Sequence, residues 1–171
     1  MTFMEALSSL FSGTNLAILG AVIATILSGI GSSIGVRMVG EAVAGVVTED
    51  PNKFGKGLIL CALPGTQGIY GLIVAFITMM KIGVLSGDVK ELTISQGAYF
   101  LFACLPIAFV GLFSAIRQAK VAVAGANILA KRPEHSTKGV VMSALVETYA
   151  ILALLVSILA LNGLKSTFAI Q

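Results

Sequence analysis

Charged residues are scarce in this chain of 171 residues. Only 11% of them are Asp, Glu, Lys or Arg, whereas 57% are hydrophobic. A soluble domain of this length needs a larger polar surface. The composition excludes an ordinary soluble globular domain and predicts an all-α integral membrane protein.

Cysteine is also rare, with one residue inside each of two apolar stretches, Cys61 and Cys104. There is no CxxC spacing and no second pair, so the sequence indicates neither a disulfide framework nor a cysteine metal centre. We expect two buried, inert thiols.

The first apolar stretch has no lysine or arginine before it, and the first basic residue, Arg37, follows it. A secretory signal carries its positive charge ahead of the apolar stretch, so we expect a retained membrane span. Four stretches are long enough for a hydrocarbon core about 30 Å thick, which needs about 20 helical residues. They run approximately from Asn15 to Val36, Gly57 to Met80, Ala98 to Ile116 and Gly139 to Leu161.

The basic residues are unevenly distributed between the two sides of these spans. Eight of the eleven lie in or beside the connections near Pro51 and Pro133, and only Lys81, Lys90 and Lys165 lie on the other side. The positive-inside rule therefore predicts that these two connections are cytoplasmic. It places both termini and the middle connection outside the cell membrane. The net positive charge requires no nucleic-acid partner.

The sequence contains a weak internal repeat with an offset of 82 residues. Matching pairs include Gly29 with Gly111, Ser32 with Ser114, Pro51 with Pro133, Lys56 with Lys138 and Thr66 with Thr148. Each half is predicted to be an antiparallel helical hairpin that turns at its proline. We expect a first hairpin over residues 1–82, an outer connection over 83–97 and a second hairpin over 98–171.

The first span contains a glycine-rich segment with Gly29, Gly31 and Gly35. Its spacing is wrong for a dinucleotide loop, and it lies in an apolar span, so we expect no nucleotide site. Small residues four apart instead let helices pack closely. We predict an inner layer made by the first and third spans, with packing inside a single four-helix bundle as the alternative.

Glu147 is a single carboxylate within the apolar fourth span. An ionisable group at that depth costs on the order of 3 kcal/mol by insertion scales, so it is normally paired and functional. In an antiparallel hairpin, residues at equal depth have numbers with a constant sum. Lys131 and Glu134 beside the turn sum to 265, as do Gln118 and Glu147. We therefore expect Gln118 beside the carboxylate.

The second span contains a polar island at the same depth, because the repeat aligns Gly65 with Glu147. Pro64 lacks an N–H group and distorts the helix, which we expect to leave the Leu63 carbonyl free. Thr66 and Gln67 add further oxygens, and Tyr70 is placed to donate a hydrogen bond to Glu147. Such oxygens suit a hard monovalent cation. The residues favour Na+, with H+ as the alternative.

Four motifs match a known family: LPGTQGIYG from Leu63, LPIAF from Leu105, KRPEH from Lys131 and VETYAIL from Val146. With them, nearly the whole chain resembles the proteolipid K or c subunit of rotary V-type and A/V-type ATPases, most closely the bacterial sodium-translocating branch. The resemblance implies sodium ligands at Leu63 (main-chain oxygen), Thr66, Gln67, Gln118 and Glu147, with Tyr70 supporting the carboxylate.

The resemblance also implies a ring of identical subunits turned by ATP hydrolysis in a separate head, so the chain itself would not be an enzyme. A stator subunit would supply an arginine, and a central stalk would meet the cytoplasmic face. Two features depart from the pattern: the longer connection around Gly83 to Asp88, and Arg117 beside Gln118. A duplicated-hairpin transporter or channel, and a purely structural membrane protein, are the rival hypotheses.

Overall fold

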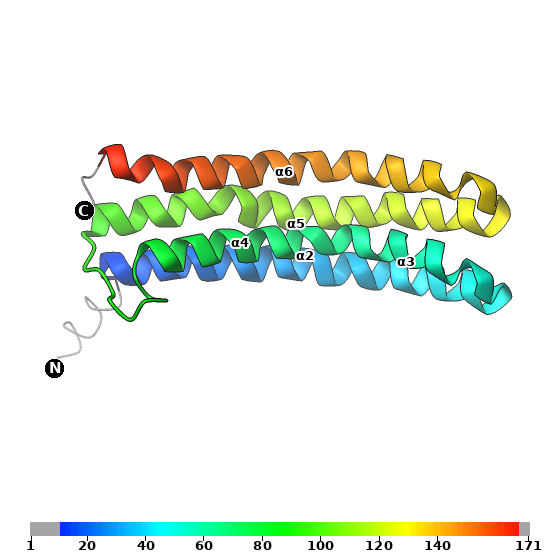
Figure 1. The fold of residues 1–171 in the computed structure, drawn as a ribbon, viewed down its shortest axis with the longest axis horizontal. Helices are drawn as coiled ribbons and strands as arrows, with labels where there is room; N and C mark the ends of the chain where they lie inside the picture. The colour runs from blue at the N-terminus through cyan, green and yellow to red at the C-terminus, as the bar shows by residue number, and fades with distance from the viewer. Residues whose placement is uncertain (1–10, 168–171) are drawn as a thin grey trace.

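The computed structural model describes residues 11–167, with side chains described through Gly163. Within that range the chain is helical and contains no strand (Figure 1). The elements are α2 (Gly13–Glu49), η1 (Pro51–Lys53), α3 (Phe54–Ala62), η2 (Leu63–Gly65), α4 (Thr66–Lys81), α5 (Ile94–Lys131), η3 (Pro133–His135) and α6 (Ser136–Thr167).

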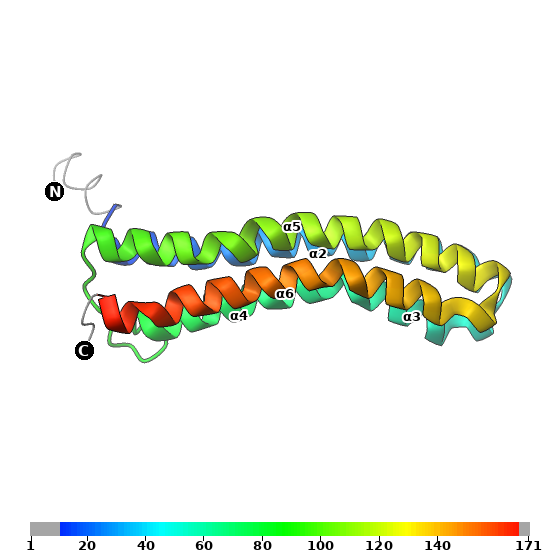
Figure 2. The same cartoon turned by 90° about the horizontal axis from the view of Figure 1, so that it is seen from above.

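The helices form two layers, which Figure 2 shows from above. α2 and α5 make one layer, and α3, α4 and α6 make the other. The prolines of η1 and η3 lie at one end of the molecule, here called the turn end. The starts of α2 and α5 and the last described turn of α6 lie at the opposite end. The all-α architecture of two tandem hairpins, predicted from the sequence, is confirmed.

Local sequence signals fix the ends of the helices. α5 begins with a capping box, in which Thr93 and Gln96 satisfy each other's backbone N–H groups. Ser12 caps α2 by accepting from the N–H of Asn15. At the turn end, Pro51 and Pro133 start the short 3-10 helices that reverse the chain.

The helices of the α2–α5 layer are longer than their apolar stretches. α2 has 37 residues and α5 has 38, so at 1.5 Å per residue each is roughly 55 Å long. All four helical segments are long and apolar enough to cross a membrane. The length of the apolar stretch corresponds to the part of the helix that would contact hydrocarbon. Each helix continues beyond it, through polar residues such as Arg37 and Lys120, to the proline turn.

Glycines allow α2 and α5 to approach closely. A Cβ on Gly20 would lie 2.7 Å from the Leu101 Cα, and one on Gly31 would lie 2.6 Å from the Leu112 Cα. Gly35 faces the Ala115 carbonyl in the same way. Gly29, also predicted to serve packing, differs: a Cβ there would have no neighbour within 4 Å. It lies instead on the side towards α4, where its Cα is 3.6 Å from the Cβ position of Gly68.

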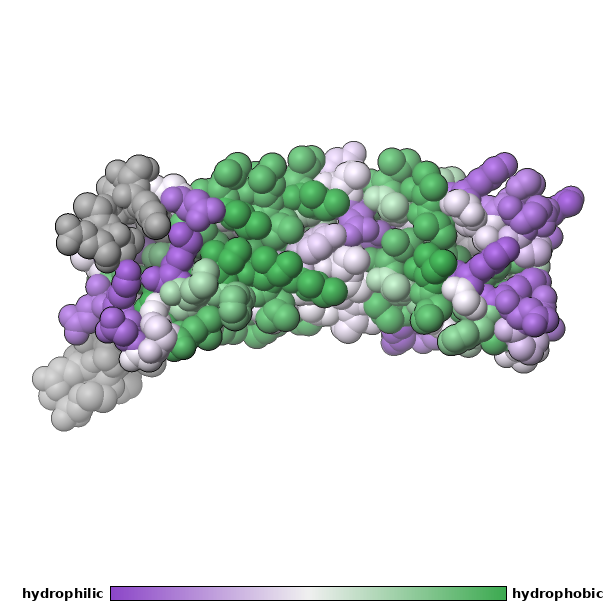
Figure 3. Space-filling view, viewed as in Figure 1, coloured by the Kyte–Doolittle hydropathy of each residue, from purple (hydrophilic) through white to green (hydrophobic). Residues whose placement is uncertain are grey.

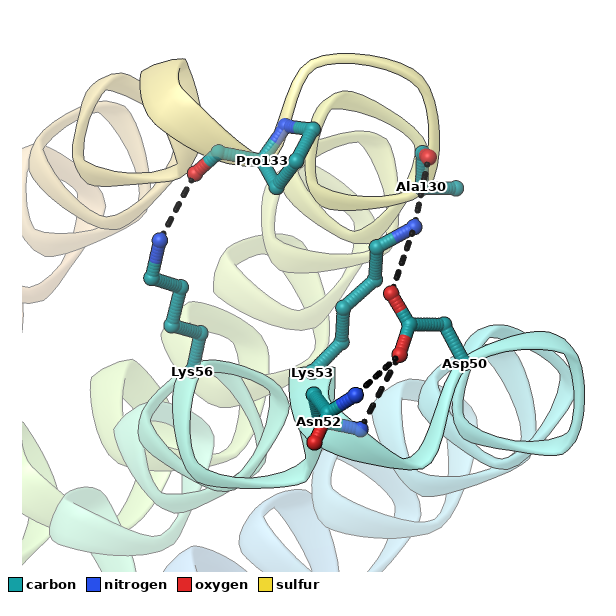
Figure 4. A network of polar contacts seen from close by, with 6 residues as sticks. All are labelled: Asp50, Asn52, Lys53, Lys56, Ala130 and Pro133. Atoms are coloured by element: carbon teal, nitrogen blue, oxygen red, sulfur yellow. Dashed lines mark hydrogen bonds and ion pairs between the residues drawn. The ribbon is translucent and has the colours of Figure 1, made fainter.

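Two lysines join the hairpins at the turn end (Figure 4). Lys53 Nζ donates to the Ala130 carbonyl at 3.0 Å and lies 3.6 Å from Asp50. Lys56 Nζ donates to the Pro133 carbonyl, also at 3.0 Å. These carbonyls lie at and just beyond the C-terminus of α5, where cations are favourable. The first hairpin therefore caps the end of the second.

The middle connection packs against the start of α2. Gly83 adopts a positive φ of 82°, and the N–H of Lys90 donates to the Ile82 carbonyl at 3.0 Å. Thr14 Oγ1 donates to the Lys90 carbonyl at 2.9 Å. The residues around Gly83 thus form a turn attached to the first hairpin at the end opposite the turn end.

Replacing Gly31 by alanine tests the close approach of α2 and α5. The added methyl group would meet the backbone of Leu112, and overpacking of this kind costs about 1–3 kcal/mol. Thermal unfolding in detergent, followed by circular dichroism, should show a lower melting temperature for Gly31→Ala. Gly45→Ala on the same helix is the control, because a Cβ there has no neighbour within 4 Å. Equal melting temperatures for the two variants would contradict this packing.

Candidate functional site

A polar belt crosses the apolar surface between its ends. Figure 3 shows a band of pale and purple residues between two green zones. Hydrogen bonds join the five sequence-predicted side chains Thr66, Gln67, Tyr70, Gln118 and Glu147 into one cluster.

Glu147, on α6, receives hydrogen bonds from two other helices. Tyr70 Oη on α4 donates to Glu147 Oε1 at 2.5 Å. Gln118 Nε2 on α5 donates to Glu147 Oε2 at 3.3 Å. The depth calculation therefore placed Gln118 correctly, and the Tyr70 contact is the one expected from the sequence. Each carboxylate oxygen thus accepts from a donor on a different helix.

Two buried glutamines extend this network. Gln67 Nε2 donates to Gln118 Oε1 at 2.5 Å, and both side chains have an exposed fraction of 0%. Buried amides need partners, because an unsatisfied one costs about 1–3 kcal/mol. The chain of contacts runs from α4 through α5 to α6 and returns to α4 at Tyr70. It links both hairpins at the depth of the carboxylate.

Pro64 breaks the helix beside this network, as predicted. α3 ends at Ala62, a 3-10 turn spans Leu63–Gly65, and α4 begins at Thr66. The expectation of a free Leu63 carbonyl is corrected, because the turn brings Thr66 onto it. The Leu63 oxygen accepts from the Thr66 N–H and from Thr66 Oγ1, the latter at 3.0 Å. Thr66 Oγ1 in turn lies 3.4 Å from Gln67 Oε1.

Three serines hold the helices around the cluster, a role that the sequence did not reveal. Ser32 Oγ accepts from the Gly68 N–H at 2.8 Å and ties α4 to α2. Ser114 Oγ donates to the Val146 carbonyl, and Ser143 Oγ donates to the Gln118 carbonyl, both at 3.3 Å. The available signal was the repeat itself, which aligns Ser32 with Ser114.

Arg117 lies outside the cluster. Its side chain is exposed, and its guanidinium carbon lies 5.9 Å from the centre of the Phe113 ring. Successive helix residues point about 100° apart, so buried Gln118 faces Glu147 while Arg117 occupies the open side of α5.

The cluster is built from neutral oxygens and one carboxylate. Among the described residues there is no group of three or more His, Cys, Asp or Glu side chains that could hold a metal ion. Hydroxyl, amide and carbonyl oxygens with one negative charge match a hard cation of low charge.

The fold and this cluster define a membrane proteolipid built from a duplicated hairpin, with one carboxylate between its helices. The family model for the C subunit of ATP synthase matches residues 19–78 and again residues 101–160. The two matches are separated by the same 82 residues as the internal repeat. The chain belongs to the ATP synthase C-subunit family.

The relatives include subunits of a sodium ATPase and of a proton ATPase. The V-type sodium ATPase subunit K of Enterococcus hirae is 51% identical over 161 residues, covering 94% of this chain and 99% of the relative. The A-type ATP synthase subunit K of Methanocaldococcus jannaschii is 41% identical over 148 residues, covering 86% and 62%. A subunit of the V-type proton ATPase of Candida glabrata is 36% identical over 95 residues, covering 56% of each chain.

Replacing Tyr70 by phenylalanine tests the hydrogen bond to the carboxylate. Hydrogen bonds to charged groups contribute about 1.5–3 kcal/mol, so Glu147 should lose part of the interaction that holds it between the helices. Carbodiimides attack carboxyl groups, and we expect the modification of Glu147 to become roughly tenfold faster. Mass spectrometry of the labelled peptide measures the rate. Tyr149→Phe is the control, because Tyr149 is 67% exposed on the same helix as the carboxylate. Unchanged labelling in Tyr70→Phe would show that the bond does not hold the carboxylate.

Proposed function

We propose that this chain is the rotor-ring subunit of a membrane rotary ATPase and carries Na+ at Glu147. Membership of the ATP synthase C-subunit family and the high identity to a sodium ATPase subunit K support this function. The observation that carries the choice of ion is the oxygen-rich cluster around the carboxylate.

The proposed sodium ligands are the Leu63 carbonyl, Thr66 Oγ1, Gln67 Oε1, Gln118 Oε1 and a Glu147 oxygen. The Leu63 oxygen would exchange its hydrogen bond from Thr66 Oγ1 for the ion. The spacing of the first three supports this set. Leu63 O and Thr66 Oγ1 are 3.0 Å apart, and Thr66 Oγ1 and Gln67 Oε1 are 3.4 Å apart. Two oxygens each about 2.4 Å from one cation, a length in the calcium–oxygen range, lie about 3.0–3.4 Å apart at angles of roughly 77–90°.

Proton transport is the alternative, because relatives include a proton ATPase subunit. A protonated carboxyl group is itself a donor and needs an acceptor. Both partners of Glu147, Tyr70 and Gln118, donate to it in the structure. This arrangement suits an ionised carboxylate whose charge a bound cation neutralises.

The mechanism follows from the electrostatics of the bilayer. An ionised Glu147 could not face lipid without a large penalty, whereas a carboxylate paired with a cation is neutral and can. The residue would load from one half-channel, travel with the ring, and unload when a stator arginine attracts the carboxylate. Carrying one charge against 100 mV requires about 2.3 kcal/mol. The chain is not itself an enzyme, so ATP hydrolysis in partner subunits supplies this energy through a central stalk.

The basic residues near the turn end support an orientation in the cell membrane. We place the turns at Pro51 and Pro133 in the cytoplasm, with the stalk against them, and the termini and middle connection outside. Lys53 and Lys56 already bridge the two hairpins on this side.

Sodium-22 binding to the purified oligomer tests the proposed ion. Wild type should bind saturably, approaching about one ion per chain, and binding should weaken at low pH because protons compete for the same carboxylate. Glu147→Gln should abolish binding. Glu134→Gln, which removes an exposed carboxylate at the turn end, should not.

Absence of specific binding in a folded wild-type oligomer would reject the sodium rotor in favour of a proton-carrying one. Binding that survives Glu147→Gln would place the ion elsewhere.

A further inference from the structure

The oxygen cluster lies at a break between two helices. α3 ends at Ala62, the turn η2 follows, and α4 begins at Thr66. The Leu63, Thr66 and Gln67 oxygens, which are proposed as sodium ligands, all come from this break and the first turn of α4. The placement of the first turn of α4 therefore decides where these oxygens lie.

The start of α4 has no cap from its own segment. The first N–H groups of an α-helix have no partner inside that helix, and a side-chain oxygen of the N-cap residue normally accepts from the second or third of them. The N-cap residue of α4 is Gly65, which has no side chain and makes no such bond. An acceptor for these N–H groups has to come from another element.

α2 supplies that acceptor. Ser32 Oγ accepts from the N–H of Gly68, the third residue of α4, at 2.8 Å. The third N–H group of a helix is one that an N-cap serine would accept from. α2 and α4 belong to different layers (Figure 2). Ser32, which is buried with 8% of its surface exposed, therefore caps α4 from the other layer.

Other serines on α2 behave differently. Ser28 Oγ and Ser33 Oγ donate to carbonyls of α2 itself, at 2.6 and 2.9 Å. Bonding back to the preceding turn is a common arrangement for a serine inside a helix. Ser32 instead contacts the backbone of a second helix, beside the oxygen cluster.

The helices fit closely around this contact. A Cβ on Gly68 would lie 3.2 Å from Ser32 Oγ, and one on Gly35, about one turn further along α2, would lie 2.8 Å from the Pro64 Cβ. α2 therefore holds the break at two points. It packs against Pro64 and accepts the hydrogen bond from Gly68.

The second hairpin has a serine at the corresponding point. Ser114, the counterpart of Ser32, donates to the Val146 carbonyl at 3.3 Å. Val146 is the counterpart of Pro64 and directly precedes Glu147. The two bonds differ in direction because α6 continues through this point, whereas α4 begins there. In both hairpins the serine contacts the backbone next to a residue of the cluster.

We propose that Ser32 is a positioning residue for the ion site. Its bond to Gly68 fixes the first turn of α4 and thereby the spacing of the ligand oxygens on that segment. The inference rests on the sodium site of the proposed function and adds a residue that does not itself contact the ion. Because the size of an oxygen cage selects the ion, Ser32 affects which cation the site prefers.

Replacing Ser32 by alanine tests this role. The change removes the acceptor and leaves the buried Gly68 N–H group unpaired. Sodium-22 binding to the purified oligomer at fixed pH should become roughly tenfold weaker, because a lost cap and an unpaired buried donor loosen the first turn of α4. Ser33→Ala is the matched control, since the exposed Ser33 hydroxyl bonds within α2. Its sodium affinity should equal that of wild type.

Competition with lithium separates positioning from a general loss of structure. Displacement of sodium-22 by unlabelled Li+ gives the ratio of the lithium and sodium affinities in one sample. Ser32→Ala should change this ratio severalfold, because the spacing of the oxygens changes. A partly unfolded sample has fewer sites, but the ratio at the remaining sites stays that of wild type.

A second pair of variants tests the same contact without removing the hydroxyl group. Gly68→Ala would place a methyl group 3.2 Å from Ser32 Oγ and push the helices apart, so it should weaken sodium binding and change the lithium to sodium ratio. Gly29→Ala is its control, because a Cβ there has no neighbour within 4 Å. Both variants replace glycine by alanine inside a helix, so their effects on helix propensity are matched.

The outcomes distinguish this inference from the proposed function. If wild type binds sodium-22 and Ser32→Ala binds equally well, or loses both ions by the same factor, the positioning role is overturned and the sodium rotor stands. If Ser32→Ala does not assemble, equal affinities and ratios in Gly68→Ala and Gly29→Ala overturn the role instead. A folded wild-type oligomer that binds no sodium contradicts the sodium site itself.

Discussion

The structure depends on the need to keep a carboxylate inside an apolar helix. Glu147 lies part-way along the apolar helix α6, and the hydrocarbon of a bilayer does not solvate a charge. Its two oxygens accept hydrogen bonds from Tyr70 and Gln118, which lie on two other helices. Because Gln118 also accepts from Gln67, one charge organises α4, α5 and α6 at a single depth. The hydrogen bonds that form the site therefore also hold the two hairpins together.

The rest of the fold holds these helices at a fixed level. Glycines bring the backbones of α2 and α5 together, and serines attach α4 to α2 and α6 to α5. Pro64 interrupts the helical segment between α3 and α4 beside the cluster, and the Leu63 and Thr66 oxygens lie 3.0 Å apart there. Duplication places two similar hairpins side by side, but only the second carries a carboxylate at the depth of the cluster, since Gly65 is the counterpart of Glu147. The first hairpin instead supplies Thr66, Gln67 and Tyr70.

The sequence was sufficient for features that depend on regular helix geometry. A constant rise and proline turns put Gln118 level with Glu147, and the repeat put the Leu63–Tyr70 island at that depth. Features that depend on the direction of individual side chains could not be predicted from the sequence. Hydropathy could not show that α2 and α5 continue far past their apolar stretches. Composition could not separate Gly29, which has room for a Cβ, from Gly31, which has none. Nor could it show that Thr66 satisfies the Leu63 carbonyl, or that Arg117 points to the open side of α5. The sodium ligands themselves stay predictions.

The central claim is that one Na+ occupies the oxygen cluster beside Glu147, and a high-resolution map of the assembled oligomer tests it most directly. Maps should be compared at saturating sodium and after sodium removal. The account predicts a density peak in the sodium form, enclosed by oxygens of Leu63, Thr66, Gln67, Gln118 and Glu147, and no peak in the sodium-free form. An identical, directly hydrogen-bonded cluster in both maps, without an enclosed peak, would contradict the account.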